Sequence, residues 1–478
     1  MKKGLALLCV AAMLFAIPST AYAADDVFGM TVEYPGLEST QADWNMATAI
    51  VQAVQRPQIP TDYEVSVKDF GAAGDGETND LPAILQAIDE TSERGGGKVI
   101  VPAGTFFCKG PVVLKSGVNL HLEEGSTILF STEPADFLPV VKTRFEGTDL
   151  MNYSPLVYAY GQHDIAITGT GLIDGNADSE FIGWASKDFE HVDERSEDMQ
   201  QLRTFGAEGT PLEERVFGEG HYLRPTMIEV DYCDRVLLEG YTVRNAPFWI
   251  NHVNCSNHVQ VRGLTVESMN SNNDGVDVES STFVIVEECK FRTGDDSVVI
   301  KSGRDYDGRQ VGLPSKYIVV RKNDMGGEDG MALGSEMSGG IAYVFVEDNI
   351  MQDGVSCFRF KSNLDRGATC EHVRIRNMKI QNFENFIWFQ MNYGGGLGGN
   401  FPTVYQDLVF EDITVESISG NIFDAHAPKG YPAQNITLKD ITIKQSEKTD
   451  LTLENVMNLM IDDLVINDQR ISGVLSSY

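Results

Sequence analysis

Short runs of alternating apolar and polar residues recur along most of the chain. From residue 235 onward, an apolar-x-apolar run, a small or polar corner and a second short alternation return at intervals of 23 to 36 residues. The copies begin at 235, 258, 283, 317, 343, 372, 408, 436 and 459, and an earlier copy begins at 164. Alternation with period two over three to five residues predicts strands with one buried face.

The near-regular period predicts a solenoid, because units this short bury their apolar face only by stacking on the next copy. Three strand runs per copy, with Asn, Gly or Asp at the corners, favour an all-β fold: a right-handed parallel β-helix. A β-propeller would need four antiparallel strands per blade, and the corresponding N-G or D-G hairpin rhythm is not seen. A solenoid also lets 478 residues fold without dividing into several compact domains.

Two segments predict helices before the repeats. The stretch TNDLPAILQAIDETSERGGG (78–97) has a polar start and a glycine-rich end. We expect it to form a short N-terminal helical cap on the open end of the stack, since terminal coils need covering. Residues 41–55 predict another amphipathic helix. The charged stretch 186–220 breaks the repeat and is interpreted as a long surface excursion.

The N-terminus reads as a signal peptide over residues 1–23. Two lysines are followed by an apolar run from Leu5 to Ile17 and by the sequence Ala-Tyr-Ala at 21–23, an A-x-A cleavage site. We therefore expect export to the periplasm or the extracellular space. No later run is long and apolar enough to span a bilayer. The expected organisation is a signal peptide, an N-terminal extension (24–64) and one β-helix domain (65–478).

The formal charge of −33 limits the possible partners. Nucleic acid and anionic membranes would be repelled by such a surface, and an anionic substrate would need local cations to hold it. Six cysteines follow the predicted signal peptide, widely spaced and without a C-x-x-C pair, so buried thiols are expected rather than a zinc site or a disulfide framework. The protein is expected to be a monomer.

Aligning the third strand run of successive copies gathers carboxylates on one face. The segments NDGVDVE (273–279), DDSVVIK (295–301), EDGMALG (328–334) and VSCFRFK (355–361) stack in register, with neighbouring rungs about 4.8 Å apart. One column then holds Asp274, Asp296 and Asp329, and the column beside it holds Asp295 and Glu328. A single aspartate at a corner is ordinary turn chemistry. Several acids on adjacent rungs repel one another, which favours a functional site.

Three basic residues lie near this acid cluster in the same alignment. Arg359 and Lys361 share a strand face two positions apart, and Lys301 stands in the same column as Lys361, two rungs before it. Beside a carboxylate cluster, Arg359 and Lys361 are typical of a clamp for an anionic substrate.

Several of these segments resemble the motifs of the polygalacturonase family, glycoside hydrolase family 28, and in particular its bacterial exo-acting branch. The matching segments are NNDGVDVES, TGDDSVVIKSGRD, GMALGSEMSGG, FRFKS, DFGAAGDGETND, LHLEEGSTILFST, MNYSPLVYAYG and NAPFWINHVNCSN, spread over roughly residues 65 to 400. The resemblance implies a right-handed parallel β-helix. It also implies hydrolysis of α-1,4-galacturonosyl linkages in pectic polysaccharide or oligosaccharide, with inversion and with neither metal nor cofactor.

The resemblance also assigns roles. Asp295 would be the general acid, and Asp274 and Asp296 would activate water. The substrate carboxylate would be bound by Arg359 and Lys361, and sugar contacts are implied for His252 and Tyr393.

One position departs from the family pattern. Where many members have Gly-His-Gly, this chain has Gly-Glu-Asp-Gly at 327–330, so that Glu328 stands beside Asp295. A second carboxyl group could keep the general acid protonated, because coupled acids share a proton. The same change could indicate rhamnogalacturonan-directed specificity or an impaired enzyme.

Two rival functions remain open from the sequence. A pectate-lyase-like enzyme would use the acids to bind calcium, which needs six to eight oxygen ligands. A glycan-binding β-helix without catalysis is the other. The glycine-rich loop GGGLGGN (394–400) lacks the Lys-Ser/Thr that follows in phosphate-binding loops, so it is interpreted as a flexible loop.

Overall fold

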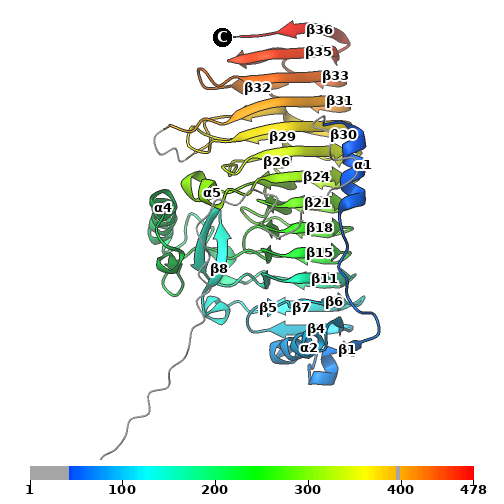
Figure 1. The fold of residues 1–478 in the computed structure, drawn as a ribbon, viewed down its shortest axis with the longest axis vertical. Helices are drawn as coiled ribbons and strands as arrows, with labels where there is room; N and C mark the ends of the chain where they lie inside the picture. The colour runs from blue at the N-terminus through cyan, green and yellow to red at the C-terminus, as the bar shows by residue number, and fades with distance from the viewer. Residues whose placement is uncertain (1–41, 395–398, 478) are drawn as a thin grey trace, which may run out of the picture.

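The computed structural model describes residues 42–394 and 399–477. The predicted signal peptide, most of the predicted extension and the centre of the glycine-rich loop lie outside the described residues. Within them, the chain winds into a tall stack of parallel strands, the β-helix expected from the repeats (Figure 1). Because consecutive parallel strands are joined by right-handed crossovers, the stack is right-handed.

Each coil contributes a strand to three parallel rows. The first row contains β1 (Glu64–Ser66), β3 (Gly97–Val101), β6 (Val118–Leu122), β11 (His163–Gly169), β15 (Asp234–Glu239), β18 (Asn257–Arg262), β21 (Thr282–Glu287), β24 (Ser315–Arg321) and β27 (Ile341–Glu347). The second contains β2 (Asp75–Asn79), β4 (Gly104–Cys108), β7 (Ser126–Phe130), β12 (Leu172–Asp174), β16 (Thr242–Arg244), β19 (Thr265–Ser268), β22 (Lys290–Thr293), β25 (Asp324–Gly326) and β28 (Ile350–Met351).

The third row is the one that carries the acid cluster. It contains β5 (Val112–Val113), β10 (Val157–Tyr160), β14 (Ile228–Asp231), β17 (Asn251–Asn254), β20 (Val276–Glu279), β23 (Val298–Lys301), β26 (Asp329–Leu333) and β29 (Gly354–Lys361). Above these rungs the rows merge into longer strands, β30 (Thr369–Gln390), β31 (Val404–Ile418), β33 (Ala433–Ser446) and β35 (Val456–Ile466), with β32 (Phe423–His426) and β34 (Leu451–Glu454) beside them.

The core lies inside the coils, where aliphatic side chains stack in register from rung to rung. In the third row, Val276, Val298, Met331 and Phe358 follow one another directly, and all four are buried. Alternate residues of the same strands point outward. This period-two division fixes the register, because a slip of one residue would turn the apolar set out of the core.

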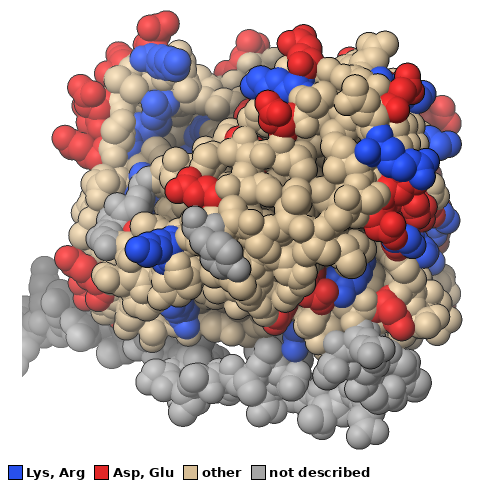
Figure 2. Space-filling model, turned by 90° about the horizontal axis from the view of Figure 1, so that it is seen from above, with Lys and Arg blue, Asp and Glu red and all other residues tan. Residues whose placement is uncertain are grey.

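Both ends of the stack are covered. Helix α2 (Leu81–Glu93) buries Leu81, Ile84 and Ile88 against the first coils, which confirms the predicted helical cap. At the other end β36 (Gln469–Leu475) pairs antiparallel with β35 and ends the parallel ladder. Figure 2 looks onto this C-terminal end and shows basic side chains in and around a hollow on the side where α4 and α5 lie.

Helix α1 (Trp44–Ala53) covers the outside of the first row rather than an end. Met46 and Ile50 belong to a small apolar cluster with Ile285, Val319 and Phe345 of three successive rungs. The following segment runs along the side of the stack towards β1 (Figure 1). The helix predicted over residues 41–55 therefore exists and fastens the N-terminal part of the chain to distant coils.

The predicted excursion at 186–220 is folded, not loose. It contains α4 (Val192–Glu208) and β13 (Val216–Phe217), and β13 joins β8 (Val141–Phe145) and β9 (Thr148–Asn152) in a separate three-stranded sheet. The apolar residues of this segment follow no period, so the sequence pattern did not reveal that the segment folds. It packs beside the third row through an apolar cluster that includes Phe145, Leu202, Phe248 and Trp249.

Two chain-wide expectations concern thiols and membranes. The six cysteines in the described part of the chain are buried and unpaired, as expected. None of the helices in residues 42–394 and 399–477 is long and apolar enough to cross a membrane.

Candidate functional site

The predicted register of the third row is confirmed. Asp277 pairs with Val299, Val299 with Ala332, and Ala332 with Arg359 on four successive rungs. The corners that precede these strands therefore stack as well.

Three of the predicted acids meet at these corners. Asp274 and Asp296 are buried, whereas Asp295 is partly exposed. One carboxylate oxygen from each of the three lies within 4.8 Å of the others. Such a cluster could hold a proton, a water molecule or a cation.

Lys361 and Arg359 neutralise the buried side of this cluster. Nζ of Lys361 donates to both carboxylate oxygens of Asp296 at 2.8 Å and lies 3.1 Å from Asp329. Nη1 of Arg359 donates to Asp329 at 2.9 Å. Burial opposes the charged form of Lys361, but Asp296 and Asp329 outweigh it and hold its pKa well above the ordinary value. These ammonium and guanidinium groups supply positive charge at the acids themselves.

Lys301 performs a similar task on the other side of the cluster. Its Nζ lies 3.8 Å from both Asp274 and Asp277 and 3.2 Å from Glu336, and it sits 4.4 Å from the centre of the Trp249 ring. Burial disfavours its charge, but these carboxylates raise its pKa nonetheless. Lys301, named from the sequence as a supporting residue, therefore lies beside Asp274 and Asp277 in the structure.

Asp274 and Asp277 form a buried carboxyl pair. Burial comes first among the causes that raise the pKa of Asp274 well above its ordinary value, followed by the charges of Asp277 and Asp295. Burial also raises the pKa of Asp277 to about 7, against the opposing effect of Lys301. Two neighbouring buried carboxyl groups cannot both ionise easily, so the pair holds a proton near neutral pH.

Glu328 stands beside the partly exposed member of the triad, as the register predicts. Its backbone N–H donates to the carbonyl of Asp295 at 3.0 Å, and its carboxylate lies 3.6 Å from Nη1 of Arg359. Burial, then the charges of Asp295 and Asp329, raise the pKa of Glu328. The position is thus occupied by a carboxyl group that gains a proton more easily than a surface glutamate.

His252 does not reach the surface on which sugar contact was expected. Its side chain is fully buried between two carboxylates, with Nδ1 3.4 Å from Glu229 and Nε2 2.9 Å from Glu279. Burial opposes its charge, but the hydrogen bonds to both glutamates raise its pKa to about 10. The ring meets Trp249 edge-on with centroids 5.2 Å apart. His252 is therefore an imidazolium buried beneath the site, and its side chain is not among those that line the pocket.

The burial of this outward face has a structural cause. Outward residues of β14, β17 and β20 would normally face water, but the hairpin formed by β8 and β9 covers them. Thr143 donates to Glu229, Lys142 pairs with Asp231 at 2.6 Å, and Arg144 donates to Asn254 at 2.8 Å. The outward polar side chains of these strands therefore make their hydrogen bonds and ion pairs with the hairpin, not with solvent.

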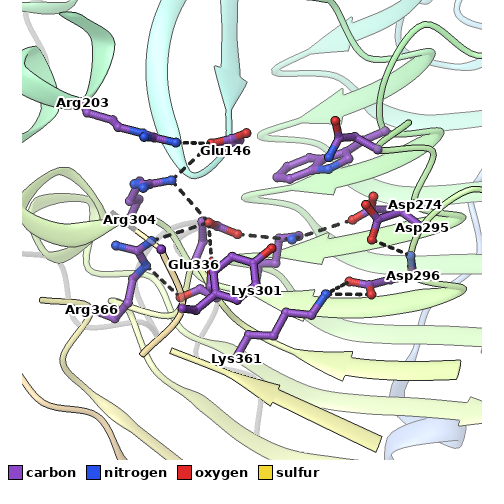
Figure 3. Close-up of a pocket in the computed structure, with 15 residues that line it drawn as sticks. Glu146, Arg203, Asp274, Asp295, Asp296, Lys301, Arg304, Glu336, Lys361 and Arg366 are labelled. Atoms are coloured by element: carbon purple, nitrogen blue, oxygen red, sulfur yellow. Dashed lines mark hydrogen bonds and ion pairs between the residues drawn. The ribbon is translucent and has the colours of Figure 1, made fainter. Parts of the chain in front are cut away.

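A pocket opens in front of the acid triad. Besides the predicted residues Lys301, Lys361 and Tyr393, it is lined by residues that the sequence reasoning did not select: Glu146, Arg203, Trp249, Asn272, Arg304, Ser335, Glu336 and Arg366 (Figure 3). Trp249, Arg304, Ser335 and Glu336 lie within segments that carry the family resemblance and could have been found there. Glu146 and Arg203 lie in the β8–β9 turn and in α4, outside the repeats, where no periodic signal marks them.

Tyr393 lines the pocket near the two predicted clamp residues. Its ring centre lies 5.8 Å from the Arg359 guanidinium and 5.9 Å from Nζ of Lys361. Trp388, one rung above Arg359, stacks on the same guanidinium at 4.4 Å. These aromatic faces hold the Arg359 guanidinium beside Tyr393, which lines the pocket.

Comparison with known proteins agrees with this geometry. The family described as "Glycosyl hydrolases family 28" matches residues 217–462, and "Rhamnogalacturonase A/epimerase, pectate lyase-like" matches residues 64–123. The solved structure of a hyperthermoactive exopolygalacturonase from Thermotoga maritima is 37% identical, with a TM-score of 0.84, and the match covers 92% of this chain and 100% of that chain.

Two curated relatives match over most of their length. A "Probable polygalacturonase" from Vitis vinifera is 28% identical over 81% of this chain and 75% of its own. An "Exo-poly-alpha-D-galacturonosidase" from Dickeya chrysanthemi is 25% identical over 89% of this chain and 72% of its own. With a family match over more than half of its length and a structural relative this similar, the chain belongs to glycosyl hydrolase family 28 and is a glycoside hydrolase.

Proposed function

We propose that this protein releases galacturonic acid one residue at a time from the ends of pectic chains. The observation that carries the proposal is a pocket that holds an acid triad and is closed on one side. The relatives named as exopolygalacturonase and exo-galacturonosidase support the choice of substrate and the exo mode.

The closed side lies one rung before Asp274. Here the outer face of the third row is filled by Trp249 and Phe248, and Phe145 of the β8–β9 hairpin stacks on Phe248 with centroids 4.8 Å apart. The acidic and basic side chains of Glu146 and Arg203 complete the wall (Figure 3). A polysaccharide cannot continue through this wall, so only a chain end can place a bond at the triad.

The three acids take separate roles in the proposed reaction. Asp295, the partly exposed member, protonates the leaving oxygen, and Asp274 and Asp296 activate a water molecule for attack at the anomeric carbon. Their shortest oxygen separations, within 4.8 Å, are tighter than the ~6.5–9.5 Å usual for an inverting pair. We propose inversion because two carboxylates are available to hold one water, and the first anomer detected by NMR tests it: the β anomer supports inversion and the α anomer contradicts it.

The clamp residues hold the sugar next to the pocket. Arg359, between the rings of Trp388 and Tyr393 at the rim, and Lys361, inside the pocket, would both attract a galacturonate carboxylate. A metal ion is not part of the proposed mechanism, since Lys301 and Lys361 already supply cationic charge to the acids.

Replacing Asp277 by Asn is expected to move the acidic limb of the profile of kcat/KM against pH to lower pH. The carboxyl of Asp277 raises the pKa of Asp274, so Asp274 ionises only at higher pH while Asp277 is present. An amide removes that effect, and the water-activating carboxylate forms in more acidic solution. Asp324→Asn, which alters a surface pair with Arg292, is the control. An acidic limb that stays in place or moves to higher pH would contradict the role given to Asp277.

Replacing Glu328 by Gln is expected to move the alkaline limb of the same profile to lower pH. Glu328 contributes a negative charge beside the triad, which helps the cluster keep its proton as the pH rises. The amide removes this charge without changing the size of the side chain. An unchanged alkaline limb, measured with the same substrate, would show that Glu328 does not replace the family histidine in tuning the acid.

A calcium-dependent lyase is the second candidate, favoured only by the tight oxygen cluster of the triad. The test is incubation of the purified protein with homogalacturonan and rhamnogalacturonan oligosaccharides, with and without a chelator, with products identified by mass. Saturated galacturonic acid supports the hydrolase. An unsaturated product that absorbs in the ultraviolet and disappears with the chelator supports the lyase. If rhamnogalacturonan is the better substrate, Glu328 accompanies specificity for that polymer. If homogalacturonan is the better substrate, it does not.

We also propose that the protein is exported and acts as a monomer. The N-terminal signal pattern supports the first point, and the pocket, which is built from one chain, is compatible with the second. N-terminal sequencing of the protein from culture fractions and its mass in solution test the two statements.

A further inference from the structure

One wall of the pocket is built from arginines that the proposed reaction does not use. Arg203 comes from α4, Arg304 immediately precedes α5 (Asp305–Val311), and Arg366 follows β29. All three line the pocket, on the side that faces the acid triad across the cavity (Figure 3). Their side chains range from 29% exposed for Arg203 to 5% for Arg304 and 0% for Arg366.

These arginines have few hydrogen-bond acceptors within the described residues. A guanidinium has five N–H donors. Nη2 of Arg203 and Nη1 of Arg304 both donate to Glu146, at 3.3 and 3.2 Å. Arg366 donates to the carbonyl of Ser335 at 3.0 Å and to Asp305 at 2.5 Å. Those four bonds are all that the three groups make with described residues.

Two of the unused donors are buried. Nε of Arg304 and Nη2 of Arg366 have no hydrogen-bond partner among the residues of the described chain. By contrast, Arg374 on the outside of the stack makes five hydrogen bonds, three of them to Asp407. A buried donor without an acceptor is costly, so native structures rarely keep one unless a ligand or water completes it.

Electrostatics point in the same direction. Glu336 is the carboxylate shared by the inner part of the wall, 3.6 Å from Nη1 of Arg304 and 4.0 Å from Nη2 of Arg366, and it also pairs with Lys301. Burial, and then the neighbouring charge of Arg304, lower the pKa of Arg366. An added anion would relieve this repulsion between Arg304 and Arg366, which their shared partners Asp305 and Glu336 offset only in part.

The position of the wall fits the shape of the proposed substrate. When C1 of a terminal galacturonate lies at the acid triad, the rest of its ring, with the carboxyl group on C5, has to occupy the pocket, and the arginines form the wall of that pocket facing the triad. Lys361 lies inside the pocket beside Asp296, and Arg359 lies near it against Tyr393, where the two would meet the carboxyl group of the following sugar of the chain.

We propose that Arg304, supported by Arg203 and Arg366, forms a second carboxylate-binding site that recognises the acidic group of the terminal sugar. This inference rests on the proposed function and assigns to the closed end of the pocket a selectivity for uronic acids over neutral sugars. The chemistry is a charge-assisted contact between guanidinium and carboxylate.

The test compares two trigalacturonates, one with a free carboxyl group on its non-reducing terminal residue and one methyl-esterified at that group alone. Arg304→Met is expected to lower kcat/KM by about 10- to 100-fold on the free acid, the range for a lost charge-assisted hydrogen bond, and to change it little on the ester. Arg304→Lys should recover part of the loss. Arg203→Met, at a more exposed position, should give a smaller loss with the same preference. Arg244→Met, an exposed arginine paired with Glu267 outside the pocket, should change neither substrate.

Equal losses of Arg304→Met on both substrates, or no loss on either, would overturn the inference. Failure of the proposed function looks different: the wild-type protein would cleave neither substrate. In that case calorimetric titration of the wild type and Arg304→Met with D-galacturonate and D-galactose decides the matter. Preferential binding of galacturonate that the substitution removes would support the site, and equal binding of both sugars would refute it.

Discussion

Replacement of Asp295 by Asn is expected to lower kcat on galacturonan by about 10²- to 10⁴-fold, the contribution typical of a positioned general acid. The amide is close to isosteric with the carboxyl group and keeps the contact from the backbone N–H of Asp296 to its side-chain oxygen, 3.0 Å in the native protein. It has no proton acidic enough to transfer to the leaving oxygen. The fold and the pocket should therefore remain while catalysis is lost.

Measurements of kinetics and of binding together show whether this variant has lost catalysis or affinity. Steady-state hydrolysis of oligogalacturonate gives kcat, and calorimetric titration with the same oligosaccharide gives affinity. We expect a large loss of kcat and a small change in affinity. Asp324→Asn, at a surface acid outside the pocket, should leave both unchanged. Wild-type protein that binds without hydrolysing, together with an Asp295→Asn protein that behaves identically, would instead identify a glycan-binding solenoid.

Replacement of His252 by Gln is expected to reduce the free energy of unfolding by about 3–5 kcal/mol at neutral pH, the loss typical of a broken buried ion pair. The imidazolium lies between Glu229 and Glu279, and all three side chains are fully buried. Glu279 keeps the backbone N–H of Gly303 and the nearby Arg144, whereas among the described residues Glu229 keeps only neutral hydroxyl donors, Thr143 and Thr226. The substitution therefore leaves a buried carboxylate without a cation.

The pH dependence of this effect has a definite sign. The pKa of His252 is raised to about 10 in the folded protein, above the ordinary value near 6.5. A raised pKa stabilises the fold fully below the unfolded value, and that contribution is lost as the pH rises through the folded value. The difference in unfolding free energy between wild type and His252→Gln should consequently shrink as the pH approaches and passes 10.

Denaturant unfolding of both proteins at several pH values measures the difference. His163→Gln is the matched control, because His163 pairs with Asp164 at the surface with 62% of its side chain exposed. Asp164 is largely buried but keeps its pair with Arg235, and an ion pair to an exposed side chain contributes about 0–1 kcal/mol, so this control should be nearly neutral. If His252→Gln is as mild as His163→Gln, or if its effect does not change with pH, His252 is not a buried imidazolium.

The sequence predicted the fold and the acid cluster for the same physical reason. Strands of period two in a stacked solenoid have little freedom in register, because a slip would expose residues such as Val276 and Val298. Once the register was fixed, Asp274 and Asp296 had to share a column, and Arg359 had to follow Ala332. Local alternation and global stacking agree in this part of the chain, and the prediction was accurate there.

The pocket walls could not be predicted from the same pattern. Glu146 and Arg203 belong to segments that interrupt the repeat, and their position depends on how the β8–β9 hairpin and α4 pack on the third row. That packing depends on scattered apolar residues, such as Phe145 and Leu202, which show no period in the sequence. Closure of the pocket was accordingly visible only in three dimensions.

At His252 the alternation predicts the direction of the side chain correctly, but the β8–β9 hairpin changes its environment. The strand position of His252 faces outward, as alternation requires, and the family resemblance implied that it contacts sugar. The hairpin that carries Thr143 covers that face and turns its polar residues into a buried network. Alternation predicts the direction of a side chain, but the covering segment determines whether it meets solvent.

The most direct test of the central claim follows the first products released from long homogalacturonan in the presence of a chelator. Chromatography of early time points separates free galacturonic acid from oligomers. We expect galacturonic acid as the product from the start, while the polymer shortens slowly from its ends. Early appearance of a mixture of oligomers would contradict the closed pocket, and the absence of any product would contradict hydrolysis of pectic chains.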